Sequence, residues 1–222
     1  MDARRVKDAL YEQFARLGKV VANAKRIELL DLLAQGERSV EALAHASAMS
    51  VTNTSAQLQV LRGARVVETR KDGNKVFYRL ADDAVAGFLV SLRDLAHVRL
   101  AEVDAVVHDY FDARDALEPI GRDELVARAE RDDVVILDVR PAEEFAAGHI
   151  PGAISAPLDE LDAVVARLPK RKHIVAYCRG PYCVLAPEAV GLLRRRGFDA
   201  RRLDDGMPEW RLAGLPVAVG VE

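Results

Sequence analysis

The stretch "LDVRPAEEFAAGHIPGAISAPLDEL" (137–161) decides the fold of the second half of the chain, because it joins a strand pattern to a helix pattern. It begins within a short apolar run, "VVILDV" (134–139), and a second such run, "HIVAYC" (173–178), follows downstream. Short apolar strands that alternate with helices are typical of parallel sheets, so an α/β domain is predicted here. The expected helices are "EEFAAG" (143–148), "LDELDAVVARL" (158–168) and "APEAVGLLRRRGF" (186–198).

The first half of the chain, up to about residue 112, has helical spacing instead. Two short helical segments, "SVEALAHAS" (39–47) and "SVTNTSAQLQVLRGA" (50–64), are separated by only a few residues, which predicts a helix-turn-helix. In "RVVETRKDGNKVFYRL" (65–80), Asp72 and Gly73 separate two β-rich runs, which predicts a hairpin. A hairpin directly after a helix-turn-helix is the wing of a winged-helix domain, so a mainly-α winged helix-turn-helix domain is expected to precede the α/β domain.

Both ends of this first half have apolar residues at helical spacing. Val6, Leu10, Phe14 and Leu17 predict an opening helix, and a long helical pattern runs over residues 82–112. The long pattern is too apolar for an isolated surface helix, so part of it needs a partner. We expect the two helices to pair two copies in a homodimer, which also suits the two-fold symmetry of duplex operators. The expected domains are 1–112 for DNA binding and dimerisation, and 113–222 for the α/β fold.

The composition restricts the class of protein. Half of the 222 residues are hydrophobic and 30% are charged, as in a globular protein with a sizeable core. No run approaches the ~18 apolar residues of a membrane span, and the opening residues lack the apolar segment of a signal peptide, so a cytoplasmic protein without a membrane partner is expected. Residues 50–79 carry six basic and two acidic residues, and such a local basic stripe favours a polyanionic partner.

The order helix, helix-turn-helix, wing and long helix resembles the ArsR/SmtB family of dimeric winged-helix regulators. The resemblance covers roughly residues 5–112 and rests on "LQVLRGARVV" (58–67) and on the wing residues Gly73, Tyr78, Arg79 and Leu80. It implies binding to a double-stranded DNA operator, with Val51 to Leu61 as the recognition helix. A solvated helix face is the alternative for the polar residues of that helix, and the adjacent basic wing favours DNA. The candidate DNA-binding residues are Thr52, Asn53, Thr54, Ser55, Gln57, Gln59, Arg62, Arg70, Lys71 and Lys75.

Metal sites of this family can be sought directly in the sequence. Its thiolate site on the first helix of the helix-turn-helix is excluded, because "SVEALAH" (39–45) contains no cysteine. Its zinc site on the terminal helix could draw on His97 and His108, but Leu95 and Phe111 stand at the positions that would complete it. No metal and no cofactor are therefore expected.

The second half resembles a rhodanese domain over about residues 117–219. The resemblance rests on "DVRPAEEFAAGHIPGA" (138–153), on "YCRGPYC" (177–183) and on "GMPEWRLAGLPV" (206–217), in that order. It implies that Cys178 is the catalytic thiol, which takes a sulfur atom from a small donor such as thiosulfate or polysulfide. Asp138, Arg140, Glu144 and His149 also match family positions and are expected to support the site structurally, while Trp210 is expected to pack in the core. The phosphatases of this fold need an arginine six positions after the cysteine, where this chain has Val184.

The residues of the loop favour the same chemistry without the resemblance. A strand that ends in a cysteine and turns into a helix directs backbone N–H groups and the helix dipole at the sulfur, and this favours a thiolate. The backbone of Arg179, Gly180, Tyr182 and Cys183 is the expected anion cradle, to which Pro181 cannot contribute a donor. Cys183 either resolves a persulfide on Cys178 or is a passive substitute for a serine.

Together the two halves predict a DNA-binding transcriptional regulator, a repressor, that senses sulfane sulfur or a related thiol-reactive species through a persulfide on Cys178. One alternative is a turnover thiosulfate or polysulfide sulfurtransferase whose winged helix serves mainly for dimerisation. Another is a metalloid-responsive repressor that uses the two loop thiols as soft ligands.

Overall fold

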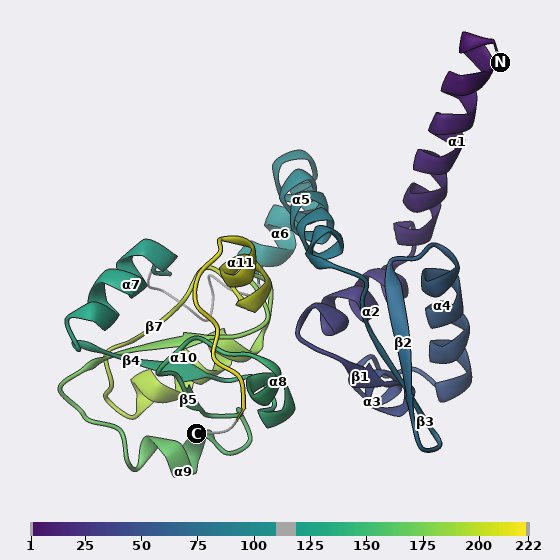
Figure 1. Cartoon of the computed structure of the whole chain (residues 1–222). Coiled ribbons are helices and arrows are strands. Elements are labelled where there is room, and N and C mark those ends of the chain that lie inside the picture. The colour runs from purple at the N-terminus through teal and green to yellow at the C-terminus, as the bar shows by residue number, and fades with distance from the viewer. Residues whose placement is uncertain (1, 110–118, 221–222) are drawn as a thin grey trace. The chain divides into compact units, whose positions relative to one another are not determined.

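The computed structural model describes residues 2–109 and 119–220, and the chain divides into two compact units, Met1–Leu89 and Val90–Glu222. Figure 1 shows the order of the elements. The division falls within helix α5 (Asp83–Arg99). The boundary predicted between residues 112 and 113 lies outside the described residues, as does Phe111, and that boundary stays a prediction.

The first unit is a winged helix. Helices α1 (Ala3–Val21) and α2 (Ala24–Ala34) precede the helix-turn-helix, which consists of α3 (Val40–Ala46) and α4 (Val51–Gly63). Each of the latter begins at a serine whose side-chain oxygen accepts a backbone N–H: Ser39 from Ala42 at 3.2 Å and Ser50 from Asn53 at 3.2 Å. The two short helices therefore begin where the capping serines place them, and the predicted helix-turn-helix is confirmed.

The wing is an antiparallel hairpin. Strands β2 (Val67–Asp72) and β3 (Lys75–Leu80) pair from Val67 opposite Leu80 to Asp72 opposite Lys75, and β1 (Arg38–Ser39) pairs with the other edge of β3. The turn needs Gly73, whose φ of +58° is a left-handed conformation that glycine adopts without strain. The Asp-Gly prediction is thus confirmed, and the register fixes which wing residues face solvent.

The long helix predicted over residues 82–112 is interrupted. Helix α5 ends at Arg99, Leu100 has extended dihedral angles (φ −113°, ψ 103°), and α6 (Ala101–Val107) begins beyond it. His97 and Asp104 form an ion pair at 3.2 Å across this break. Seven residues of continuous helix would separate their backbones by about 10 Å. The break therefore bends the chain so that these two side chains meet, which the periodicity of apolar residues did not reveal.

The second unit contains a four-stranded parallel sheet in the order β5-β4-β6-β7. Its strands are β4 (Val134–Asp138), β5 (Ile154–Ser155), β6 (His173–Tyr177) and β7 (Ala200–Arg202), and its helices are α7 (Arg122–Glu130), α8 (Ala142–Ala147), α9 (Leu161–Val165), α10 (Leu185–Arg195) and α11 (Met207–Leu212). The predicted strands and helices of this half are confirmed within a few residues at their ends. Figure 1 shows α7 and α9 on opposite sides of the sheet.

Strand β6 is buried on both faces, and its side chains alternate between two cores. Ile174, Ala176 and Cys178 pack in the core that also contains the apolar faces of α9 and α10. Val175 and Tyr177 pack on the other face with Trp210 of α11 and Leu125 of α7. Because side chains alternate along a strand, this arrangement brings Cys178 to the side of α10. Trp210 is 3% exposed, as expected for a core residue.

Candidate functional site

The two cysteines lie at the ends of a tight loop between β6 and α10. Cys178 directly follows the strand and is 3% exposed, whereas Cys183 precedes α10 and is half-buried. The N–H of Cys183 donates to the carbonyl oxygen of Gly180 at 3.1 Å, which closes the loop on itself. Sγ of Cys178 lies 3.6 Å from the carbonyl oxygen of Cys183, and the two thiol side chains are hydrogen-bonded to each other.

Four backbone N–H groups donate to the two sulfur atoms. Those of Gly180 and Ala186 donate to Cys178, and those of Arg179 and Leu185 donate to Cys183. The expected cradle included Cys183 as a donor to Cys178, but the turn within the loop uses that N–H for Gly180 instead. The residues that sequence reasoning missed are Leu185 and Ala186, which follow the loop at the start of α10. The free N–H groups of a helix start were the signal for them.

The two thiols differ in pKa, and Cys183 ionises more readily than Cys178, although Cys178 was the expected thiolate. Burial raises the pKa of Cys178 well above its usual value, and the neighbouring Cys183 raises it further. The hydrogen bond from Cys178, the N–H groups of Leu185 and Arg179, and the charge of Arg179 lower the pKa of Cys183 to about 7. The expectation of a thiolate at Cys178 is therefore wrong for the resting site, because burial outweighs its N–H donors. The proton that the thiols share stays on Cys178.

Two ion pairs support the loop between β6 and α10. The guanidinium of Arg179 binds the buried carboxylate of Glu144 at 2.6 Å. Arg140 and Asp138, both fully buried, pair at 2.5 Å beneath the ends of β4 and β6. The pKa of Tyr177 is raised, mainly because the side chain is buried. Its hydroxyl donates a hydrogen bond to Asp138 at 2.6 Å. The loop thus rests on a connected polar network.

The fourth of the matched support residues, His149, lies at the edge of this network. Its Nδ1 is 2.9 Å from the carbonyl oxygen of Phe145, on whose ring the imidazole stacks with centroids 3.7 Å apart. The carbonyl oxygen of the preceding Gly148 accepts a hydrogen bond from Arg140 at 2.7 Å. His149 therefore orders the chain beside the network and does not reach the thiols.

Helix α11 closes the loop from the opposite side. A Cβ atom on Gly206 would lie 2.3 Å from the carbonyl carbon of Arg179, so only glycine fits where the two backbones meet. Glu209 accepts the N–H of Gly206 at 2.9 Å and forms an ion pair with Arg93. Gly206 and Glu209 lie in "GMPEW" (206–210), and the spacing of a helix start followed three residues later by glutamate was the signal that would have identified them.

Tyr182, a loop residue of the predicted site, lies against the part of α5 that belongs to the second unit. Its ring centroid is 5.8 Å from Cζ of Arg93 and 6.2 Å from the imidazole of His97. Arg93 also lies over the loop backbone, because a Cβ atom on Gly180 would be 3.1 Å from its Nη1. Side chains of α5 therefore cover the loop near Tyr182 and Gly180, and backbone atoms at Gly206 cover it near Arg179.

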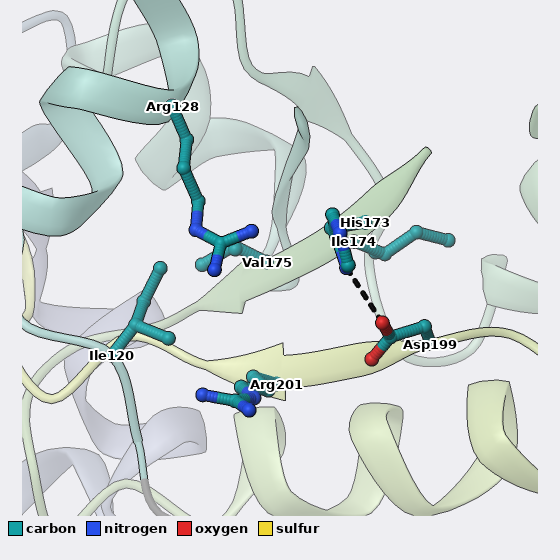
Figure 2. A pocket seen from close by; sticks show the side chains of 7 residues that line it. All are labelled: Ile120, Arg128, His173, Ile174, Val175, Asp199 and Arg201. Atoms are coloured by element: carbon teal, nitrogen blue, oxygen red, sulfur yellow. Dashed lines mark ion pairs between the residues drawn. The ribbon is translucent and has the colours of Figure 1, made fainter. Parts of the chain in front are cut away.

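Two hollows in the second unit differ in their relation to the thiols. A small pocket of about 40 Å³ lies at the other end of β6, and Figure 2 shows the ion pair of His173 and Asp199, 2.6 Å apart, on its wall. A wider, shallow pocket of about 540 Å³ is lined by Leu185, by Val139 and by the acidic Glu143, Asp159 and Glu160. Leu185 is the residue whose N–H binds Cys183, so only the wider pocket borders the loop.

The candidate DNA-binding residues divide by exposure. Thr52, Asn53, Gln59 and Arg62 are exposed on α4, and Lys71 and Lys75 are exposed on the wing. Thr54 is fully buried and its hydroxyl donates to the carbonyl oxygen of Ser50 at 3.0 Å, so the expectation that it reaches a base is wrong. The signal for this was its spacing, because Thr54 stands four and seven residues before Leu58 and Leu61 and so lies on the buried face of α4.

Three further candidates are less accessible to DNA, because they are half-buried or already paired with residues of the first unit. Ser55 is half-buried, and Gln57 accepts a hydrogen bond from Arg26 at 3.0 Å. Arg70 pairs with Glu37 at 2.6 Å and with Asp72 at 3.2 Å. The positive charge of the wing tip is therefore carried by Lys71 and Lys75 more than by Arg70.

Two further properties concern metals and membranes. Within residues 2–109 and 119–220, no three side chains of the metal-binding types gather as ligands. Over the same residues, none of the helices has the length and apolar character needed to cross a bilayer.

The chain has known relatives for each unit and for its whole length. Residues 23–69 match the bacterial regulatory proteins of the arsR family, and residues 121–213 match the rhodanese-like domain. Over 214 residues the chain is 49% identical to the HTH-type transcriptional regulator Rv0324 of Mycobacterium tuberculosis, with 96% of this chain and 94% of the relative covered. It is 30% identical to a sulfurtransferase of Allochromatium vinosum over 90 residues, which are 40% of this chain and 82% of that protein.

Among solved structures, the chain is similar to the homodimeric winged helix-turn-helix domain of Mb0332 from Mycobacterium bovis. The identity is 44%, the TM-score is 0.42, and the match covers 45% of this chain and 91% of that one. Fold and site together define a winged helix-turn-helix transcriptional regulator with a rhodanese-like domain. The chain belongs to the arsR family of bacterial regulatory proteins.

Proposed function

We propose that this regulator is a homodimeric repressor that senses sulfane sulfur through a persulfide on Cys178. The observation that carries the proposal is the pair of hydrogen-bonded thiols at the carboxyl end of a buried parallel strand, where four N–H groups point at their sulfur atoms. Such a site stabilises negative charge on sulfur and excludes bulk water from Cys178. The proposed domains are 1–112 for the operator and the dimer contact, and 113–222 for the sulfur chemistry.

The loading step uses the unequal ionisation of the pair. With a pKa of about 7, Cys183 is about half ionised at neutral pH, and its thiolate takes the proton of Cys178 as the donor approaches. The thiolate of Cys178 then attacks the outer sulfur of thiosulfate or the terminal sulfur of a polysulfide. A bond forms between Sγ of Cys178 and that sulfur, and sulfite or a shorter polysulfide leaves with the electron pair of the broken S–S bond. The N–H groups of Gly180 and Ala186 hold the product.

Operator binding is assigned to α4 and the wing. The exposed side chains of Thr52 and Asn53 can reach base edges, Gln59 lies near the DNA backbone, and Lys71 and Lys75 can neutralise phosphates. The apolar residues of α1 that face solvent in the single chain, Val6, Leu10, Tyr11, Phe14 and Leu17, supply the dimer contact. Two copies then present two recognition helices to the half-sites of one operator. Sulfur loading is proposed to weaken operator binding, with a coupling free energy of ~1–3 kcal/mol.

The test compares operator binding with and without sulfur. Electrophoretic or anisotropy titrations use the promoter region of the protein's own gene, with the full chain in its reduced form and after treatment with inorganic polysulfide. We expect polysulfide to weaken binding by the unchanged chain about fivefold or more, and to leave binding by the Cys178→Ser variant as it was. An equal response of the two proteins would show that Cys178 is not the sensor.

A turnover sulfurtransferase is the second candidate, favoured by the relative from Allochromatium vinosum that is named a sulfurtransferase. The enzyme and the sensor predict different results for sulfur transfer and for operator binding. Steady transfer of sulfur from thiosulfate to cyanide that depends on Cys178, together with operator binding that ignores polysulfide, would establish the enzyme and exclude the sensor. Operator binding that responds to arsenite and not to polysulfide would instead support a metalloid-responsive repressor.

A further inference from the structure

The half-buried thiol of Cys183 has the properties of a reactant. It is more exposed than Cys178, it accepts N–H groups from both sides of the loop, and it is hydrogen-bonded to the thiol of Cys178. A passive serine substitute at this position could also contact the sulfur of Cys178, but it would not need to ionise. The closed turn between Gly180 and Cys183 keeps the two sulfur atoms together, because it returns the chain toward the end of β6.

We propose that Cys183 attacks the persulfide on Cys178 and closes a Cys178–Cys183 disulfide with release of hydrosulfide. This proposal rests on the proposed function, because it begins from the persulfide.

The step balances without a further oxidant. A lone pair of the Cys183 thiolate forms a bond to Sγ of Cys178, and the bond between that Sγ and the outer sulfur breaks. The outer sulfur leaves with the electron pair of the broken bond and takes up a proton from water, so that hydrosulfide is released. The two thiols together lose two electrons, and the sulfane sulfur that came from the donor gains them.

The unequal ionisation of the pair suits this order of events. Cys183 passes the acquired proton to solvent through its exposed side once the persulfide has formed, and the N–H groups of Leu185 and Arg179 and the charge of Arg179 favour its return to a thiolate. Its Sγ then faces the buried sulfur of Cys178 at hydrogen-bonding range. Cys178 is shielded from solvent, so a thiol within the loop reaches its inner sulfur more readily than an external one.

A disulfide between Cys178 and Cys183 would suit a sensor but would inhibit a turnover enzyme. Once it has closed, the loop holds no thiol that could take a second sulfur atom, so the site stops after one event and stays oxidised until a reductant opens it. An enzyme that turns over would be inhibited by the same bridge. The structure thus favours a loop that records exposure to the donor.

The test is peptide mapping of the full-length protein without oxygen. Trypsin cleaves after Lys172, Arg179 and Arg194, so Cys178 and Cys183 lie on separate peptides, 173–179 and 180–194. The reduced protein is mixed with an equimolar amount of inorganic polysulfide, and free thiols and persulfides are then blocked with iodoacetamide. We expect the two peptides to be joined by a disulfide, with loss of two hydrogen atoms and no added sulfur, and an equivalent of sulfide to be released.

Two variants keep the result interpretable. In Cys183→Ser, we expect Cys178 to keep its persulfide, detected as peptide 173–179 with one added sulfur. In Cys178→Ser, no bridge can form. The fluorescence of Trp210, the only tryptophan of the chain, reports whether the second unit of each variant is folded.

The possible failures are distinguishable. If the unchanged protein keeps a persulfide on Cys178 while Cys183 is fully alkylated, the bridge is refuted and the persulfide sensor survives. If neither thiol of the unchanged protein is modified by polysulfide, the proposed function fails together with the bridge.

Discussion

At the scale of single residues, the two cysteines differ in environment although they share one short loop. Cys178 is surrounded by the core of α9 and α10, and Cys183 lies between the end of the loop and solvent. Their N–H donors are equal in number, so the deeper burial of Cys178 and the hydrogen bond that its thiol donates to Cys183 decide which sulfur ionises first. This difference predicts which thiol an alkylating reagent attacks and at what pH.

Iodoacetamide should modify Cys183 and spare Cys178 at neutral pH. Below pH 7 the rate at Cys183 should fall about tenfold per pH unit, because the thiolate fraction falls, and above pH 8 it should level off. Timed quenching and tryptic mapping of peptides 173–179 and 180–194 measure both rates. Faster modification of Cys178 than of Cys183 would contradict the assigned ionisation.

Removing Asp138 should destabilise the second unit strongly. In Asp138→Ala, Arg140 keeps its charge at 0% exposure without its carboxylate partner, which costs about 3–5 kcal/mol. Denaturant unfolding followed by Trp210 fluorescence measures the change in free energy of unfolding. The matched control is Asp162→Ala, which breaks the exposed pair with Arg196 and should cost less than about 1 kcal/mol. Equal effects of the two variants would show that burial of the network is unimportant.

At the scale of elements, the loop between β6 and α10 is supported differently on two sides. Gly206 of the α11 start touches the loop backbone, whereas Gly180 of the loop itself faces the end of the Arg93 side chain. A backbone cannot move out of the way, but the end of an arginine can. The two glycines therefore have different tolerance for a larger residue.

Gly206→Ala should displace the thiol loop, and Gly180→Ala should not. The first places Cβ at 2.3 Å from the Arg179 backbone and should cost about 1–3 kcal/mol or more. The second needs only a shift of Arg93, whose Nη1 is at 3.1 Å. Unfolding monitored by Trp210, together with the alkylation rate of Cys178, compares them. Loss of protection at Cys178 in Gly180→Ala alone would reverse this assignment.

The exposed stripe on α1 should hold the dimer together. Leu10→Asp and Phe14→Asp place a charge among side chains that are 51% and 61% exposed in the single chain and buried in the proposed dimer. Sedimentation equilibrium should then show monomers at concentrations where the unchanged protein is dimeric. Glu12→Gln, also on α1 and exposed, is the control and should stay dimeric. A dimer that survives both aspartates would place the contact elsewhere.

The winged helix could be read from the sequence almost to the residue. Ser39 and Ser50 begin their helices, and Asp72-Gly73 turns the wing, because caps and turns are local properties of a few residues. The break at Leu100 was not predicted, since neither glycine nor proline marks it. His97 and Asp104 form an ion pair across the bend, and a periodicity of apolar residues carries no information about such pairs.

The site was predictable in position but not in electrostatics. The strand, the loop and the following helix could be assigned from the sequence, and they bring the two thiols together as the spacing suggested. The order of the two pKa values depends on how deeply each sulfur is buried, which is a property of the packed fold. Thr54 is a different case, because its spacing from Leu58 and Leu61 placed it on the buried face of α4 and was overlooked.

At the scale of the whole molecule, the chain joins an operator-binding unit to a unit with reactive sulfur, and its net charge of −3 hides a basic wing. DNA binding should therefore depend on a few cations. Lys71→Gln and Lys75→Gln should each lower the steepness of the salt dependence of operator binding by about one counterion. Arg70→Gln should change it less, because Glu37 and Asp72 already neutralise this residue. Anisotropy titrations at several salt concentrations measure the slopes, and a larger effect of Arg70 than of the lysines would overturn the ranking.

The alternation of β6 has a mechanical consequence. Tyr177 and Cys178 are neighbours in the chain, yet one is anchored in the layer with Trp210 and the other in the layer with α10. A sideways or twisting movement of this strand end would disturb both layers at once, and the hydroxyl of Tyr177 ties it to Asp138 as well. The root of the loop is thus fixed from both faces of the sheet, whereas its other end, at Cys183, is half-buried.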